Sequence, residues 1–137
     1  MHKLRNSVAV AVVVGLGMSS PGMAQSNMVG EAAFADACAV CHGPNGQGDG
    51  EFASVLTIKP PDLTTISMRN DGQFPYLKVF QIVDGRTTMR AHGTSVMPIW
   101  GDYFSREVAG GSGGYGTELM VRARIVALVD YIETLQK

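Results

Sequence analysis

The sequence is poor in cysteine and histidine, and each shortage excludes a class of protein. Its 137 residues contain two cysteines and three histidines. Both cysteines lie within one five-residue segment, so none is left for a structural disulfide. A zinc site is excluded as well, because no second cluster of cysteine or histidine occurs at the spacing that zinc ligands require.

The first 24 residues contain no acidic residue, and their pattern predicts an export signal. A basic start, an apolar run over residues 8–18 and a small, turn-rich end precede Ala24, after which we predict cleavage. The apolar run is short against the roughly 20 residues that span a bilayer, which disfavours an uncleaved membrane anchor. We therefore predict a signal peptide over residues 1–24 and a single domain over residues 25–137.

The predicted mature chain carries little positive charge. Removal of the signal takes away Lys3 and Arg5 and leaves nine basic residues against twelve acidic ones, a net charge of −3. Binding to nucleic-acid phosphates needs a basic face, so we expect no nucleic-acid partner. The remaining lysines, Lys59, Lys78 and Lys137, are too few to form a ring that would steer the protein onto an acidic partner.

No segment alternates apolar and polar residues for long enough to predict a strand, so we predict an all-α fold. The capping residues Ser26 and Asn27 predict a first helix that ends at Ala37. A second helix is predicted over Pro75–Val83, with Gly85 as its stop. The apolar face of this second helix is formed by Leu77, Phe80 and Val83. The last helix has one apolar stripe at spacings of four and three, which is typical of a half-buried helix: Val121, Ile125, Leu128, Ile132 and Leu135.

The segment Cys38-Ala39-Val40-Cys41-His42 carries the most information about chemistry. Two thiols separated by two residues can each add to a vinyl group of haem, and the adjacent histidine then lies beneath the iron as its proximal ligand. The pattern predicts one haem c, with its iron, per chain: Cys38 and Cys41 anchor it as thioethers and His42 is an axial ligand. Covalent haem attachment in bacteria takes place outside the cytoplasmic membrane, so the motif and the export signal together predict a periplasmic protein.

Glycine and proline define the connections between the predicted helices. The glycines of residues 43–50 predict a surface loop, which fits a flat cofactor better than a phosphate because no Lys-Ser/Thr ending follows. Residues 60–64 are predicted to close this loop with a turn or a helix start. Residues 86–99 are predicted to be an irregular loop, and Gly110–Gly116 a glycine-rich linker.

The sixth coordination position of the iron decides the function, and Met97 is the leading candidate for it. A thioether is a soft ligand that favours Fe(II), raises the reduction potential and blocks small-molecule binding. Pro98 restricts the backbone beside it. His92, in the same loop, is the rival ligand, because neutral imidazole also binds iron; we favour Met97 and interpret His92 as hydrogen-bonded to backbone or to a haem propionate. Arg86 and Arg90 either pair with propionates, face a partner or are solvated charges.

The chain resembles the bacterial class I (mitochondrial-type) monohaem cytochromes c from about Gly30 to Leu135. The residues that carry the resemblance are Gly30 and Phe34, Cys38 to Gly43, Pro60 to Leu63, Gly85, Met97 to Gly101, and Leu128 to Ile132. The haem motif and the methionine–proline loop are its specific parts. The chain departs from the family at Gly110–Gly116, where the family commonly runs directly into the last helix, and in its lysine-poor surface.

The resemblance implies a small class I cytochrome c fold, in which the first and last helices cross at close range and loops enclose the haem. Gly30 would permit the close approach, with Phe34 and Tyr131 packed at the crossing. The resemblance also implies that Trp100 lies close to the haem, and it agrees with the ligands and anchors named above.

Together these features predict a single-electron carrier that is not an enzyme. We expect redox proteins as partners, with a dehydrogenase or oxidoreductase as donor and an oxidase or reductase as acceptor, and contact with a membrane only through such a partner. One alternative is a cytochrome subunit held permanently by a periplasmic dehydrogenase. A further alternative is a haem enzyme or gas sensor with an open sixth position.

Overall fold

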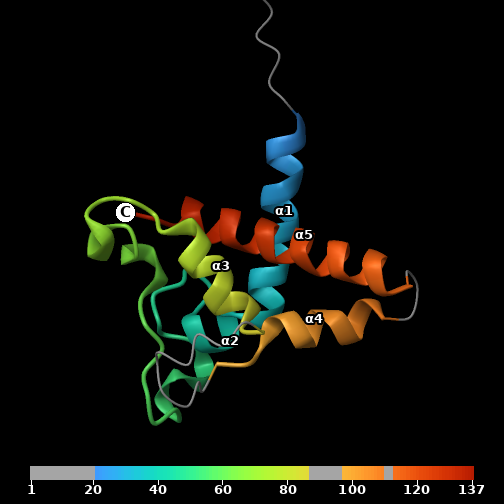
Figure 1. Cartoon of the computed structure of the whole chain (residues 1–137). Coiled ribbons are helices and arrows are strands. Elements are labelled where there is room, and N and C mark those ends of the chain that lie inside the picture. The colour runs from blue at the N-terminus through green and yellow to red at the C-terminus, as the bar shows by residue number, and fades with distance from the viewer. Residues whose placement is uncertain (1–20, 87–96, 110–112) are drawn as a thin grey trace, which may run out of the picture.

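The computed structural model describes residues 21–86, 97–109 and 113–137 (Figure 1). All regular elements within these residues are helices and none is a strand, so the predicted all-α fold is confirmed. The α-helices are α1 (Pro21–Ala37), α2 (Ala39–His42), α3 (Tyr76–Asp84), α4 (Trp100–Val108) and α5 (Gly113–Thr134). Three short 3₁₀ helices lie in the connections: η1 (Glu51–Ser54), η2 (Leu63–Thr65) and η3 (Met68–Asn70). Within the described residues, no helix combines the length and the apolar character needed to cross a membrane.

Helices α1 and α5 cross in contact with each other, as Figure 1 shows. The crossing depends on Gly30, because a Cβ atom placed there would collide with the carbonyl oxygen of Ala127 and lie 2.8 Å from the Cβ of Tyr131. Phe34 packs beside this point, and its ring centroid lies 5.4 Å from that of Tyr131. The structure therefore confirms the close approach and the aromatic pair that the resemblance implies.

Helix α5 is the centre of the core, since α1, α3 and α4 all pack against it. Of the predicted stripe, four residues are buried and Leu135, which follows the end of the helix, is half-buried. Ala127 and Val129 are buried as well. The buried surface of α5 is therefore wider than the single predicted stripe, because three helices pack around it.

Two predicted helices differ in detail from those observed. Helix α1 already runs from Pro21, the first residue that the structure describes, so Ser26 and Asn27 lie inside the helix and the prediction that they cap it is wrong. In α3 the predicted apolar face is wrong at Leu77, which is exposed. The buried side chains Val79 and Val83 instead lie one turn apart and set the face that packs inward.

Helix α4, which begins three residues after Met97, was not predicted. Its aromatic residues Trp100, Tyr103 and Phe104 recur at spacings of three and four, but the helix is short and contains Gly101. The predicted linker Gly110–Gly116 is wrong in its second half, because α5 already begins at Gly113. Residues 110–112 lie outside the described residues.

Candidate functional site

The imidazole of His42 is buried and held in one orientation. Its Nδ1 atom lies 3.2 Å from the carbonyl oxygen of Pro61. Because a carbonyl can only accept, Nδ1 carries the proton and Nε2 keeps its lone pair. Burial lowers the pKa of His42, and the hydrogen bond to Pro61 opposes this shift only in part. The histidine is thus a neutral imidazole whose Nε2 lone pair can bind a metal.

The two thiols lie on the same short stretch of helix as the histidine. Cys38 precedes α2 and is buried, whereas Cys41 lies inside α2 and is half-buried. They are three positions apart, which on a helix places side chains on one face, and they form no disulfide. Burial, with a smaller contribution from Cys41, raises the pKa of Cys38 to about 12. Burial therefore disfavours the thiolate of Cys38 before haem is attached.

The glycine-rich loop folds back onto the backbone of this motif. The amide of Gly48 donates to the carbonyl of His42 at 2.7 Å, and that of Gly50 donates to the carbonyl of Cys41 at 3.2 Å. A Cβ atom at Gly50 would lie 2.6 Å from the carbonyl oxygen of Ala39. The loop is irregular as predicted, but its four glycines are buried. Their role is to let the loop lie against the motif's own peptide groups.

The segment after Pro61 is secured by two of its own residues, Asp62 and Thr64, and by Gln136, which the sequence did not single out. The carboxylate of Asp62 accepts from the amide of Thr64 at 2.8 Å and caps η2, which confirms the predicted helix start. These hydrogen bonds from Thr64 lower the pKa of Asp62. From the C-terminus, the side chain of Gln136 donates to the carbonyl of Leu63 at 2.8 Å and accepts from the amide of Ser67 at 2.9 Å.

Met97 is half-buried and packs against the hydrophobic core that includes Cys38. Pro98 and Ile99 are exposed after it, and α4 begins at the next residue. The rival ligand His92 lies outside the described residues, as does Arg90. The described structure therefore brings Cys38 and Met97 to one core, and the roles predicted for Met97, His42 and the two cysteines stay predictions.

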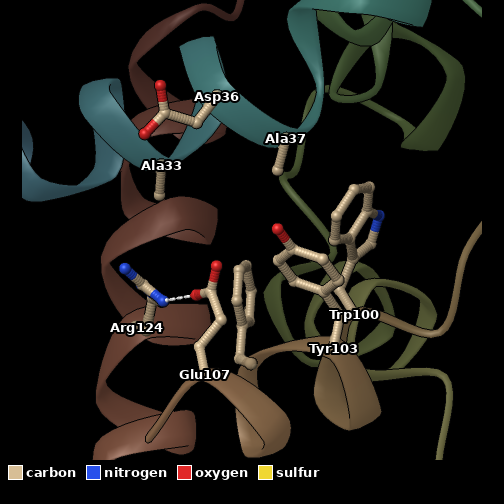
Figure 2. A pocket seen from close by; sticks show the side chains of 8 residues that line it. Ala33, Asp36, Ala37, Trp100, Tyr103, Glu107 and Arg124 are labelled. Carbon is tan, nitrogen blue, oxygen red and sulfur yellow. Dashed lines mark hydrogen bonds and ion pairs between the residues drawn. The ribbon is translucent and has the colours of Figure 1, made fainter.

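Trp100 is the first residue of α4, and with Ala37 at the end of α1 it lines a small pocket of about 140 Å³ (Figure 2). Figure 2 shows its indole nitrogen pointing away from the ion pair of Glu107 and Arg124. The Trp100 ring stacks on Phe104 with centroids 5.9 Å apart. Its Nε1 atom is buried and has no hydrogen-bond partner within the part of the chain that the structure describes.

Arg86 is neither a solvated charge nor an isolated loop residue. Its guanidinium donates to Asp84 at 2.6 Å and to Glu118 of α5 at 2.7 Å. Burial partly offsets the effect of these carboxylates, yet the pKa of Arg86 is raised, chiefly by Glu118. The solvated interpretation of this arginine is therefore wrong.

The side chains at this site fit the haem that the motif predicts. Two free thiols three positions apart, an oriented neutral imidazole and a thioether are the donor set that a covalently held iron porphyrin needs. Trp100 adds an independent observation, because buried N–H groups are nearly always hydrogen-bonded. A haem propionate is an acceptor of the kind that would satisfy the orphaned Nε1 atom.

Comparison with known proteins agrees with this site. The family model for cytochrome c matches residues 28–136, most of the chain. No curated protein and no solved structure matches the chain. The chain therefore belongs to the cytochrome c family, which implies covalently bound haem c, haem-based electron transfer and redox partners.

Proposed function

We propose that this cytochrome c is an exported, periplasmic single-electron carrier. In this proposal Cys38 and Cys41 would hold one haem c through thioether bonds, and His42 and Met97 would supply the two protein ligands of its iron. When bound, the haem iron supplies a one-electron Fe(III)/Fe(II) couple. The single observation that carries the proposal is the buried His42 imidazole, oriented by the Pro61 carbonyl beside two free thiols.

The proximal residues act by holding a donor atom still. The hydrogen bond from Nδ1 to Pro61 fixes the tautomer and the ring orientation of His42, which leaves Nε2 as the donor. The same hydrogen bond increases the basicity of the imidazole. The buried Gly48 and Gly50 satisfy the backbone carbonyls of His42 and Cys41 through hydrogen bonds from their own amides. A donor held in this way needs little rearrangement when the charge on the metal changes.

Met97, the proposed distal ligand, acts through the preference of its soft thioether sulfur for Fe(II). Met97 offers a thioether, which binds Fe(II) better than Fe(III) and so raises the reduction potential. Its packing against the core restricts the positions that its side chain can take. A methionine that occupies the sixth position also keeps out small ligands, which favours electron transfer over reaction with peroxide or gases.

The helix crossing is compatible with export and cleavage after Ala24. Asn27, Met28 and Val29 are exposed, and Gly30 is the first buried residue among those from 27 onward. The part of α1 that cleavage would remove thus precedes the crossing with α5. The proposed mature protein, residues 25–137, would keep every described contact of Gly30 and Phe34.

The test of the distal ligand compares methionine and histidine variants of the haem-loaded protein. We expect Met97→Ala to abolish the sulfur-to-iron charge-transfer band of the ferric form and to lower the reduction potential. His92→Ala should keep both, as should Met68→Ala, which replaces an exposed methionine outside the proposed site. Loss of the band in His92→Ala with its retention in Met97→Ala would overturn the assignment.

Three further measurements test the carrier function and the compartment. Free carriers elute near their monomer mass on size exclusion of native extract, whereas a permanent dehydrogenase subunit elutes in one large complex. Ready binding of carbon monoxide by the reduced protein at neutral pH would favour an open-site enzyme or sensor. Mass spectrometry of the periplasmic fraction should find Gln25 as the first residue.

A further inference from the structure

The chain on either side of residues 87–96 comes together in the folded protein. We call residues 84–86 and 97–101 the distal stem. A Cβ atom at Gly85 would lie 3.3 Å from the Cα of Ile99, so the two backbones touch. At Gly101 a Cβ atom would collide with Asp84 Oδ1 and Arg86 Nε. The end of α3 and the start of α4 are therefore packed directly against each other, with Met97 between them in the sequence.

Arg86 joins this stem to the central helix. Its Nε donates to Asp84 at 2.6 Å, and its Nη1 and Nη2 donate to the two carboxylate oxygens of Glu118 at 2.7 Å and 3.3 Å. This contact is bidentate, so it restricts the relative orientation of the guanidinium and the carboxylate more than a single hydrogen bond does. Arg122 donates to the same carboxylate at 2.5 Å, one turn further along α5.

The buried negative charge of Asp84 is compensated by the positive charge of Arg86. Asp84 is buried and is the last residue of α3, where the helix dipole disfavours a negative charge. It also lies against Gly101 in the first turn of α4, where the dipole favours one. A buried carboxylate without a partner is costly, and Arg86 provides that partner. The arginine thus links α3 to α5 through two carboxylates, and both Asp84 and Arg86 lie close to Gly101 of α4.

An ion pair between α4 and α5 can be compared with the contacts of Arg86 in the stem. Arg124 pairs with Glu107, and its guanidinium lies 4.9 Å from the ring centroid of Phe104. Both side chains of this pair are 40% exposed, as is Glu118. Glu107 lies near the far end of α4, away from the stem. Its loss should affect the packing of α4 without affecting the start of that helix.

We propose that Arg86 is a positioning residue for the distal iron ligand: by bridging Asp84 and Glu118 it fixes the stem on which Met97 is presented. The inference rests on the proposed role of Met97. With the stem closed, the methionine is held beside the core at little further entropic cost. With the bridge broken, the stem samples open arrangements in which the thioether leaves the iron, and an added ligand competes more successfully.

The experiment measures how readily imidazole displaces the native sixth ligand of the ferric, haem-loaded protein. Binding is followed by loss of the sulfur-to-iron charge-transfer band. In Arg86→Gln and in Glu118→Gln we expect imidazole to bind roughly fivefold tighter or more than in the unaltered protein, the size of a typical coupling between two sites. Glu118→Gln keeps the contact of Arg86 with Asp84, so it tests the inference even where Arg86→Gln folds poorly.

The matched control is Glu107→Gln, which removes the ion pair that Glu107 of α4 makes with Arg124 of α5. We expect its imidazole affinity to match that of the unaltered protein, even if its free energy of unfolding falls as much as that of Glu118→Gln. Equal imidazole affinities in Glu118→Gln, Glu107→Gln and the unaltered protein would overturn the inference. An increase of the same size in Glu107→Gln would overturn it too, since general loosening would then be the cause.

Met97→Ala separates this inference from the function on which it rests. If that variant keeps the band, Met97 is not the ligand, and both the proposed ligation and the inference fail. If that variant loses the band while Arg86→Gln and Glu118→Gln bind imidazole as the unaltered protein does, only the inference fails. Loss in Met97→Ala with tighter imidazole binding in both stem variants supports the two together.

Discussion

The proximal segment, residues 38–65, and the distal stem hold their proposed iron ligands by different physical means. Around His42 the contacts are hydrogen bonds of the backbone and of the Pro61 carbonyl, and the glycines that make them are buried. Around Met97 the stem is joined by an arginine between two carboxylates, one of which is 40% exposed. Neutral, buried contacts respond weakly to salt and pH, whereas exposed ion pairs respond to both. We therefore expect the distal side to be the more easily disturbed.

The largest effect is expected from Gly48→Ala in the proximal segment. Gly48 has φ of +77°, and a Cβ atom there would collide with the carbonyl oxygen of Pro60 and lie 3.2 Å from the carbonyl carbon of Pro61. We expect a loss of about 3 kcal/mol in the free energy of unfolding, from left-handed backbone strain and overpacking together. Denaturant unfolding measures it.

Gly72→Ala is the matched control for that variant. Gly72 has nearly the same backbone angle, with φ of +78°, but no atom lies within 4 Å of its Cβ position. It should lose only the backbone part, about 1 kcal/mol. If the two variants lose the same amount, the contact of the loop with Pro60 and Pro61 adds nothing, and the view of the proximal segment as tightly packed is wrong.

The next effect is expected from Gly101→Ala in the distal stem. The added Cβ atom would lie 2.7 Å from the carbonyl oxygen of Asp84, so the stem must open, at a cost of roughly 1–3 kcal/mol. Thermal unfolding measures the loss, and the charge-transfer band should weaken with it. Gly114→Ala places the same change in helix α5 with open space around it, and should stabilise the protein by up to about 1 kcal/mol.

A smaller effect is expected from Gln136→Ala, which removes the side-chain hydrogen bonds between the C-terminus and the segment around Leu63. The side chain makes three hydrogen bonds, to Leu63, Ser67 and Ile132. Water replaces part of each, so we expect a loss of about 1–2 kcal/mol in denaturant unfolding. Gln73→Ala, at an exposed side chain, should leave stability unchanged. Equal losses in both variants would show that the C-terminus does not secure the segment.

The smallest effect is expected from acid acting on the distal stem. Arg86 and Arg122 hold the pKa of Glu118 below its usual value. A lowered folded-state pKa means that this stabilisation is complete above the unfolded pKa, near about 4.3, and is lost as the pH falls through the folded value. The midpoint of thermal unfolding, measured from pH 6 downward (about 6 to 3), should fall less in Glu118→Gln than in the unaltered protein. A parallel decline in the two would contradict this assignment.

The covalently bound haem could be predicted from the sequence, because the residues that indicate it are close together in the chain. The haem motif spans five residues, and the helix that ends the chain repeats its apolar residues at helical spacing. Helix α4 escaped prediction because it is short and contains Gly101. Leu77 was misplaced because Val79 and Val83, spaced one turn apart, determine which face of α3 packs inward.

The sequence by itself determined the haem-attachment motif, the helical fold class and the membership in the cytochrome c family. These depend on local spacing and periodicity, which the chain carries in any conformation. Only the tertiary structure decided what holds each donor in place. The acceptor for His42 lies 19 residues away, the partner of Arg86 on α5 lies 32 away, and Gln136 reaches a carbonyl 73 residues before it. Such partners are chosen when the helices pack, since burial makes an unpaired polar group costly and favours the arrangement in which each finds a partner.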